Sequence, residues 1–393
     1  HPIYNFCTYT NQPCMICHTY LYAQGSWPLL NMVPEADKYQ LVLVFGDRFL
    51  LQKEDITSPL AEYFINAKIV AASSAGEILQ NEQFTDGAVA IAIHFEKTNI
   101  HICQRNLSSF TSSSGLGITL ANELPKENLK YAMLLADGNK INGTELVSAI
   151  TGKLGNNVLI TGGMAGDNDR FTQTFLGVDG NLEEGNVVLI GFYGDSIEIN
   201  SSIRGGWEAF GPERIITFSD KNILYEIDQT PSLAFYKKYL GKYAAELPAS
   251  ALLFPLALYE KDNGEPIVRT ILSINEEEQS MTFAGNVPQG SMVRLMKANV
   301  NNLVKAADTA AKEVLASSNE AAPDLALVIG CIGRKMIMGH FGEEETEAIA
   351  SNFNEQTKII GFLSYGEIAP THPNTVCRLH NQSIIITTFR ELI

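Results

Sequence analysis

The residues best suited to chemistry include a short stretch near the start of the chain. Cys14 and Cys17 are separated by two residues, and His18 follows directly, in the sequence CMICH. This spacing is typical of covalent haem attachment, in which the thiols add to the vinyl groups and the imidazole binds iron. Such attachment requires an oxidising compartment. A structural zinc is no better supported, because zinc takes four ligands and this stretch supplies three.

Glycine-rich turns form a second group of candidate residues, and each follows an apolar run. The turns contain Gly76 with Glu77, Gly162 with Gly163, and Gly366 with Glu367. Glycine lets backbone N–H groups approach an anion, so the turns suit the carboxylate of a small zwitterion. Glu77 or Glu367 would bind its ammonium group. Alternatively, the glycines only turn the chain and the glutamates cap helices.

Charged side chains concentrate in the stretch GDNDRF, which contains Asp167 and Arg170. Calcium and magnesium need more oxygen ligands than this loop offers, so an Asp/Arg pair that orders the turn is the better interpretation. Arg170 is also a candidate anion clamp, because its fork binds carboxylates through two hydrogen bonds. Arg269 lies in the apolar IVRTIL, where an unpaired charge is costly, so it needs an ion-pair partner or a ligand. Arg204, close to Trp207, could likewise form a structural ion pair or bind a ligand.

Histidines are the candidates for non-covalent haem, which needs one axial ligand in an apolar pocket. His94 in IAIHF and His340 in MGHF are the candidates, although a histidine in such a place is more often a hydrogen-bonded structural residue.

Enzyme signatures are missing from the sequence, which has no nucleophile elbow, phosphate-binding loop or zinc-protease motif. Ser74 and Ser364 precede the glycine turns and are the residues on which a hydrolase or transferase with a cryptic site would depend. No histidine base stands in a recognisable relation to either, so we predict that the protein is not an enzyme.

Composition narrows the class of partner. Acidic residues outnumber basic ones 44 to 28 over 393 residues, which gives a formal net charge of -16. Such a surface repels phosphate backbones and anionic membranes, so nucleic acid and membrane partners are not expected. No apolar run approaches the roughly 20 residues of a membrane span, and no signal peptide is visible. Six scattered cysteines favour a reducing cytosol over a disulfide framework.

The elements that must position these residues form an internal repeat. Residues 41–46 and 325–330 are buried strands, each followed by a helix-compatible stretch. Each copy ends in a matching run, KIVAASSAGEI at 68–78 and KIIGFLSYGEI at 358–368. A weaker third copy begins with a strand at 131–138. Its helix has Gly155 as the C-cap, and its second strand runs into the loop of Gly162 and Gly163.

Continuous apolar strands on both sides of a helix predict parallel pairing with helices covering the sheet. Alternating segments at 87–95, 186–194 and 382–389 then suit antiparallel pairing. We therefore predict an α/β protein with mixed sheets, built from repeated strand-helix-strand units with glycine-rich loops.

Several of these stretches, taken together and in order, resemble proteins of the FIST family, which pair a FIST N domain with a FIST C domain. The resemblance covers roughly residues 25–393 and is carried by AASSAGEI, GGMAGDNDRF, FAGNVPQGSMVRLM, GFLSYGEIAP and LHNQSIIITTF. It divides the chain into a FIST N-like domain at 25–218 and a FIST C-like domain at 219–393. Residues 1–24 would be an extension or leader outside the fold, with Met15 as an alternative start.

The resemblance implies an intracellular sensory protein that binds a small ligand, such as an amino acid, and signals to a partner enzyme. Its shared motifs add Tyr365 and His380 to the candidate ligand-binding residues. One branch of the family senses nitric oxide through haem and controls a histidine kinase, which keeps that function open as an alternative. We expect a cytoplasmic protein with no certain cofactor, and with non-covalent haem favoured over haem attached at Cys14 and Cys17.

Overall fold

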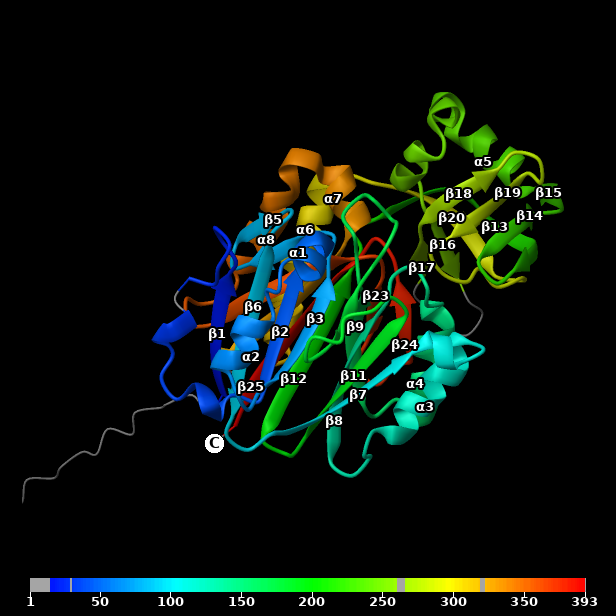
Figure 1. Cartoon of the computed structure of the whole chain (residues 1–393). Helices are drawn as coiled ribbons and strands as arrows, with labels where there is room; N and C mark the ends of the chain where they lie inside the picture. Colours follow the sequence, from blue (N-terminus) through cyan, green and yellow to red (C-terminus); the bar gives the residue numbers. More distant parts are fainter. Residues whose placement is uncertain (1–14, 29, 260–265, 319–321, 393) are drawn as a thin grey trace, which may run out of the picture.

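The computed structural model describes residues 15–28, 30–259, 266–318 and 322–392. Most of the chain forms a large body of three mixed sheets, and residues 208–297 form a smaller lobe at one corner of the body (Figure 1). No helix in these ranges is long and apolar enough to cross a membrane.

Each predicted repeat unit contains the expected parallel pair of strands. The pairs are β2 (Leu41–Gly46) with β3 (Lys68–Ser73), β8 (Leu129–Ala136) with β9 (Leu159–Met164), and β21 (Leu325–Cys331) with β22 (Lys358–Ser364). We number the three units, and the sheets built on them, first, second and third in this chain order. The connecting helices are α1 (Arg48–Lys53) and α2 (Ser58–Tyr63), α4 (Gly143–Leu154), and α7 (Ile332–Met338) and α8 (Gly342–Ala350). Gly155 ends α4 with φ 81°. The predicted units and the mixed α/β fold class are thus confirmed.

The predicted antiparallel strands form, and the strands that follow two of them connect the units to one another. β6 (Ala88–Phe95), β11 (Asn186–Tyr193) and β25 (Ile384–Glu391) each pair within their own unit. The strands that follow β6 and β11 cross to the next sheet: β7 (Asn99–Asn106) pairs with β11, and β12 (Ile197–Arg204) pairs with β25.

Short strands after the glycine turns also pair with another unit, but in the opposite direction around the three units from β7 and β12. β4 (Glu77–Leu79) of the first unit pairs with β22, β10 (Leu176–Val178) of the second pairs with β3, and β23 (Glu367–Pro370) of the third pairs with β9. β5 (Glu82–Phe84) and β24 (Cys377–His380) extend these sheets at their edges. The first sheet therefore contains strands from two units, and the second and third sheets contain strands from all three, so the units cannot be separated.

Strand alternation divides the body into one central core and three outer ones. Along β2, Leu41, Leu43 and Phe45 enter a cluster that also holds residues of β8 and β21, whereas Val42 and Val44 pack outward. Helices cover the outer faces: α1 and α2 on the first sheet, α3 (Ser113–Glu123) and α4 on the second, and α6 (Val300–Ala316), α7 and α8 on the third. The sheets thus surround a shared interior.

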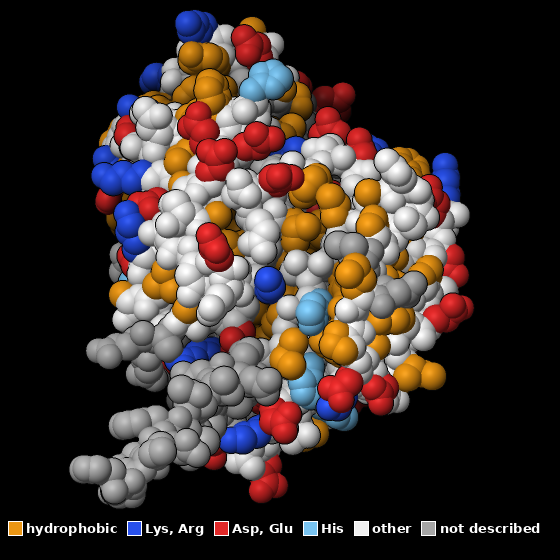
Figure 2. All heavy atoms as spheres, turned by 90° about the vertical axis from the view of Figure 1, so that its left-hand side faces the viewer, with side chains coloured by type: hydrophobic (Ala, Val, Ile, Leu, Met, Phe, Trp, Pro, Cys, Tyr) orange, Lys and Arg blue, Asp and Glu red, His pale blue; other side chains and the backbone are white. Residues whose placement is uncertain are grey.

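The segment 15–21, expected to lie outside the fold, is part of it. It forms β1 (Met15–Leu21), which pairs antiparallel with β6, and Met15 and Cys17 lie in the central core. The prediction that residues 1–24 lie outside the fold is therefore wrong for this strand, because its alternating apolar residues complete the first sheet. Residues 1–14, including Cys14, lie outside the described residues. Figure 2 shows the face that carries β1, with acidic side chains over its upper part and histidines among hydrophobic side chains lower down.

The lobe lies between β12 and α6 in the chain. Its strands are β13 (Glu208–Asp220), β14 (Ile223–Ile227), β15 (Thr230–Pro231), β16 (Leu256–Tyr259), β17 (Ile267–Arg269), β18 (Ile271–Asn275), β19 (Ser280–Phe283) and β20 (Met292–Lys297), with α5 (Ser232–Leu240) packed on them. The boundary expected between residues 218 and 219 falls inside β13. A division there also cuts the third sheet, whose neighbours β12 and β25 come from opposite sides of the lobe. Structurally, the chain divides into body and lobe.

Backbone hydrogen bonds close the three units into a ring where the second parallel strands end. Ala75 N donates to Leu363 O at 2.8 Å, Tyr365 N to Met164 O at 3.1 Å, and Gly166 N to Ser73 O at 2.9 Å. These three bonds lead from the first unit to the third, from the third to the second, and from the second back to the first.

The carboxylates beside this ring are buried inside the body. Glu77 accepts hydrogen bonds from Ser74 Oγ and from Gly87 N, just before β6. Glu367 accepts them from Ser364 Oγ and from Ser383 N and Oγ, just before β25. Burial raises the pKa of Glu77 to about 8 and that of Glu367 to about 7. Both side chains tie a turn to the start of the next strand and have no free face toward solvent.

A buried ion pair links the third unit to the entrance of the lobe. Arg334 of α7 is fully buried and bonds to Glu345 of α8. It also donates to the carbonyls of Gly205, before the lobe, and of Leu303, in α6. One guanidinium thus holds both chain connections of the lobe.

Replacing Arg334 with Met should lower the free energy of unfolding by about 3–5 kcal/mol, because Glu345 is left buried without its partner. Arg105→Met, which removes an exposed pair with Glu123, is the control and should cost about 1 kcal/mol or less. Urea denaturation measures both, and equal losses would show that the Arg334 pair contributes no more than a surface pair.

Folding raises the pKa of Glu77 from 4.5 to about 8, so the folded state binds this proton more tightly than the unfolded chain. The stability that results is fully present below pH 4.5 and is lost as pH rises toward 8. Glu77→Gln should therefore flatten the fall in unfolding free energy across this window. Replacing the exposed Glu82 with Gln should leave the pH profile of the unfolding free energy parallel to that of the wild type. Parallel profiles for all three proteins, measured by urea denaturation at several pH values, would contradict the assignment.

Candidate functional site

A cavity of about 600 Å³ lies between body and lobe and is lined mainly by apolar side chains. The body contributes residues that follow β8, β9, β21 and β22, and the lobe contributes the segment between α5 and β16 and the start of β18. The lining residues are Gly138, Asn139, Phe171, Cys331, Ile332, Gly333 and Tyr365 from the body, and Glu246, Leu247, Pro248, Ala249, Leu252, Thr270, Ile271, Leu272 and Ala284 from the lobe. We call this cavity the lobe cleft. It lies at the carboxyl ends of parallel strands, where open α/β sheets place ligands.

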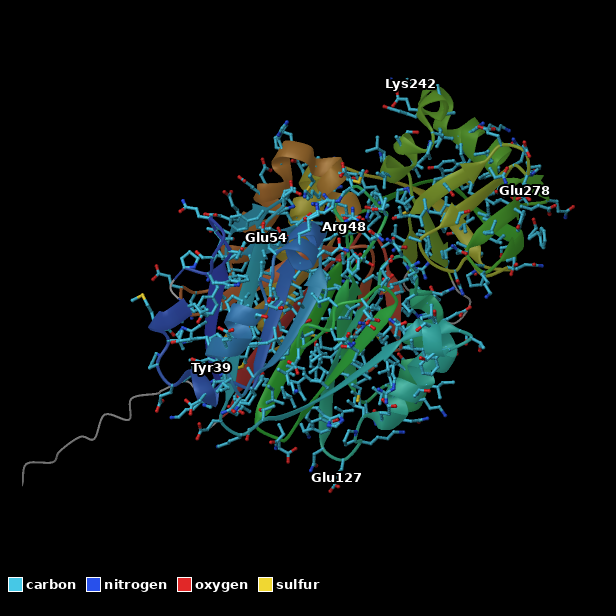
Figure 3. The ribbon with its side chains drawn as sticks, viewed as in Figure 1. Tyr39, Arg48, Glu54, Glu127, Lys242 and Glu278 are labelled. Carbon is cyan, nitrogen blue, oxygen red and sulfur yellow. The ribbon has the colours of Figure 1, made fainter. Side chains whose placement is uncertain are left out.

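The orientation of the body is visible from two labelled side chains. Arg48 follows β2 and lies at the strand-end face of the body, near the side of the lobe, whereas Glu127 precedes β8 and lies at the opposite end (Figure 3). The lobe cleft therefore belongs to the same end of the body as the ring of glycine turns.

Two stacked aromatic rings form part of the cleft wall. The rings of Phe171 and Tyr365 lie 4.7 Å apart with their planes at 23°. Tyr365 Oη donates to Asn168 O at 2.9 Å and accepts from Phe171 N at 3.1 Å, so the stack is fixed at the backbone. Phe171 has φ 50°, a conformation that a bulky residue adopts only under constraint, and 43% of it is exposed. The body thus holds an open aromatic face toward the cleft.

The lobe supplies a polar group opposite this apolar surface. Thr270 is 7% exposed and lines the cleft, and its Oγ1 has no hydrogen-bond partner among the described residues. Buried polar atoms without a partner are rare, because an unmade hydrogen bond costs about 1–3 kcal/mol. The hydroxyl is available to a ligand.

A second cavity of about 350 Å³ adjoins the cleft and shares Ile332 with it. Its lining is polar and includes Asp86, Asn168, Asp169, Arg170 and Lys335, together with Thr85, Met336 and Gly339. We call it the charged cavity.

Arg170 lines the charged cavity but is held by carboxylates of the body. Its Nε lies 2.7 Å from Asp167 Oδ1, its Nη2 bonds to Asp47, and its Nη1 lies 3.7 Å from Asp86. The predicted Asp167–Arg170 pair therefore forms, and Arg48 adds a second cation 3.0 Å from Asp167. Bonds to Asp47 and Asp167 raise the pKa of Arg170 despite its partial burial. With its carboxylate partners already present, Arg170 is poorly placed to clamp a ligand anion.

The predicted glycine positions differ from one another. Gly162 and Gly163 lie within β9, and a Cβ on Gly162 would meet Leu134 O at 1.8 Å, so these glycines serve close packing in a sheet. Gly76 and Gly366 lie in turns at the ring, where Gly76 has φ 142°. With Glu77 and Glu367 buried, the turns provide no ammonium site, because both carboxylates are already hydrogen-bonded within the body.

Four further candidates join elements of the fold. Arg269 donates to Asn286 O in the lobe and to Leu379 O in the body. Trp207 Nε1 donates to Gln382 O, and His380 Nε2 bonds to Ala369 O, with burial lowering the pKa of His380 to about 4. Arg204 pairs with Glu313 of α6. Among the predicted ligand-binding residues, Tyr365 and Arg170 are the ones that line the two cavities.

Sequence reasoning missed Phe171, Thr270 and Lys335. Phe171 ends the quoted stretch GDNDRF and could have been singled out as an aromatic residue in a polar turn. Thr270 and Lys335 carry no such signal, because their roles depend on the lobe and on α7 packing against distant loops.

The histidines proposed for non-covalent haem do not fit an axial ligand in an enclosed pocket. His94 Nδ1 bonds to Lys38 O at 2.9 Å and its Nε2 lies 3.4 Å from Glu96. His340 is exposed on a short 3-10 helix. The described part of CMICH does not fit covalent attachment either, because Cys17 points into the central core while His18 lies on the other face of β1 against Tyr39. Haem binding stays a prediction that the visible spectrum of the purified protein would test.

The serines considered as nucleophiles are fully buried, and the hydroxyl of each donates a hydrogen bond to a glutamate side chain, Ser74 to Glu77 and Ser364 to Glu367. Neither lines the lobe cleft or the charged cavity. Among the described residues, no group of three or more His, Cys, Asp or Glu side chains could hold a metal ion.

The chain shows similarity to known proteins. An uncharacterized protein of Methanocaldococcus jannaschii is 25% identical over 254 residues, which is 56% of this chain but 46% of that protein. The chain thus spans about half the length of this relative. The crystal structure of a cyanuric acid hydrolase from A. caulinodans aligns with 97% of this chain and all of its own, at 5% identity and a TM-score of 0.42. That similarity is too weak to support a functional argument.

The model of the FIST N domain matches residues 40–230, and that of the FIST C domain matches residues 232–370. FIST domains are associated with the sensing of small ligands in signalling proteins and are sensory, not catalytic. Because the two matches cover most of the chain, the protein belongs to the FIST family and consists of a FIST N domain followed by a FIST C domain.

Proposed function

We propose that the protein senses a small metabolite, an amino acid or a similar molecule with an apolar side chain, by binding it in the lobe cleft. The observation that carries this proposal is the cleft itself, a mostly apolar cavity of about 600 Å³ formed jointly by body and lobe. Its size falls within the range of small-molecule sites, and its lining has the expected mixture of apolar walls and a few polar groups.

The aromatic stack supports an apolar ligand. Phe171 presents an exposed ring that is already held in place by Tyr365, so a ligand that covers it gains contact without ordering a mobile side chain. Leu247, Pro248 and Ile271 of the lobe lie across the same cavity. Thr270 Oγ1 would gain a hydrogen bond from a ligand that reaches it.

We propose that signalling depends on the cleft being lined by both the body and the lobe. A ligand that contacts body and lobe together favours the lobe orientation in which both sets of contacts form, and it shifts the population toward that orientation. A partner protein that binds only one orientation of the lobe would then respond to whether the ligand is bound. We propose a signalling enzyme such as a histidine kinase in the cytoplasm as that partner, which agrees with the sensory character of the family.

Replacing Phe171 with Ala should weaken ligand binding about tenfold to a hundredfold, because an aromatic face is removed from the site. Phe218→Ala is the matched control. Phe218 is also exposed and also stacked, at 4.9 Å and 25° on Tyr225, but it lies outside the cleft lining. Thermal-shift screening of amino acids, followed by calorimetric titration, measures the effect. Equal affinity in wild type and both variants would place the ligand elsewhere.

A further inference from the structure

The charged cavity contains a cation without an ion-pair partner. Lys335 Nζ is partly buried and donates to Ala75 O at 3.0 Å and to Thr85 Oγ1 at 2.9 Å, both neutral acceptors. In the described part of the chain, no carboxylate oxygen lies within ion-pair distance of this ammonium group. Two of its three N–H donors are thus used by neutral groups, and the third is available.

Unpaired acceptors lie on the same cavity wall. Asn168 is 5% exposed, and its Nδ2 donates to Asp47 and Asp86, but its Oδ1 has no hydrogen-bond partner among the described residues. Asp169 is exposed, lines the cavity and forms no ion pair within the described ranges. By contrast, Asp86 is already engaged by Asn168 and lies close to Arg170.

The cavity therefore offers an ammonium donor from α7 and carboxylate and amide acceptors from the turn at residues 168–169. Because Lys335 is partly removed from water, its charge gains from an anionic partner, while Asp169 and Asn168 Oδ1 can accept hydrogen bonds from a cationic group. A ligand that carries both signs would meet both needs. Ile332 lines both cavities, so the charged cavity lies directly beside the apolar lobe cleft.

We propose that the charged cavity binds the zwitterionic end of an α-amino acid, with Lys335 at its carboxylate and with Asp169 and Asn168 Oδ1 at its ammonium group. The apolar side chain then passes Ile332 into the lobe cleft. This proposal rests on the proposed function and adds to it the groups that select the ligand. Lys335 takes the role that the sequence suggested for Arg170, and Asp169 the role suggested for Glu77 and Glu367.

Two series of matched probes test the assignment: L-leucine, L-leucinamide and 4-methylpentanoate, and L-phenylalanine, L-phenylalaninamide and 3-phenylpropanoate. In each series the second probe lacks the carboxylate and the third lacks the ammonium group. Calorimetric titration at about pH 6.5 keeps the amines protonated. Wild-type protein should bind the amino acid of at least one series about tenfold or more tightly than either analogue, since a hydrogen bond to a charged group is lost in each case.

Variants separate the two ends of the ligand. Lys335→Met and Lys335→Gln should bind the amino acid no better than its amide, while they keep the preference over the carboxylic acid that lacks nitrogen. Asp169→Asn should show the reverse pattern. Lys305→Met in α6 and Asp220→Asn in the lobe, both exposed, should behave as wild type. Circular dichroism confirms that each variant is folded, and the Gln variant retains a donor for Ala75 O if the Met variant does not fold.

Equal affinity for amino acid and amide in wild type, or a preference that survives in both Lys335 variants, would overturn the assignment. If either result is found while binding still depends on Phe171, the lobe cleft remains the ligand site and only the role of the charged cavity is refuted. If none of the six probes binds wild-type protein, the amino-acid form of the proposed function falls together with this proposal.

Discussion

The exchange of short strands between neighbouring units is the constraint on which the rest of the structure depends. β4, β10 and β23 have three or four residues each, and each pairs with a long strand of another unit. Without this exchange each sheet would expose an inner face of Leu, Ile and Phe side chains, which are buried only because the three sheets meet. The ring of backbone hydrogen bonds at Ala75, Tyr365 and Gly166 is the consequence, since it forms where the chain leaves one sheet for the next.

Closure of the ring explains why the most chemically suggestive residues are structural. Where three units converge, backbone groups and carboxylates leave water together and must find partners inside. Glu77 and Glu367 are used for that purpose, and Asp167 is shared between Arg48 and Arg170. In the described part of the chain, Thr270 Oγ1 has no hydrogen-bond partner and Lys335 and Asp169 form no ion pair, and all three line the two cavities. The centre of the body therefore fixes the geometry, and under the proposed function the cavities beside it bind the ligand.

Local periodicity predicted much of the body and little of the site. Apolar runs at residues 41–46 and 325–330, with helices between like-patterned strands, identified the parallel pairs, and Gly155 identified the end of α4. Strand exchange was not predictable, because β4 and β23 follow their glycine turns as two or three apolar residues with no mark of their partner sheet. β1 was missed because the spacing of Cys14, Cys17 and His18 suggested haem chemistry instead of a strand. The turns lie at the carboxyl ends of the parallel strands, as predicted, but burial of their carboxylates depends on contacts across the ring.

The position of the lobe in the chain bears on how a ligand could be sensed. The lobe is entered through Gly205 and Gly206, and a Cβ on Gly206 would meet Asn302 O of α6 at 2.5 Å, so the entry strand lies tightly against the exit helix. Arg334 binds Gly205 and Leu303 on the same two connections, and Arg269 with Asn286 attaches the lobe to the body near β24 and α4. The cleft begins directly beside Arg334, at Ile332 and Gly333. Under the proposed function, a ligand that drew the lobe toward Phe171 would act next to the residues that hold both connections, and a change in lobe orientation would be transmitted to α7, α8 and the third sheet.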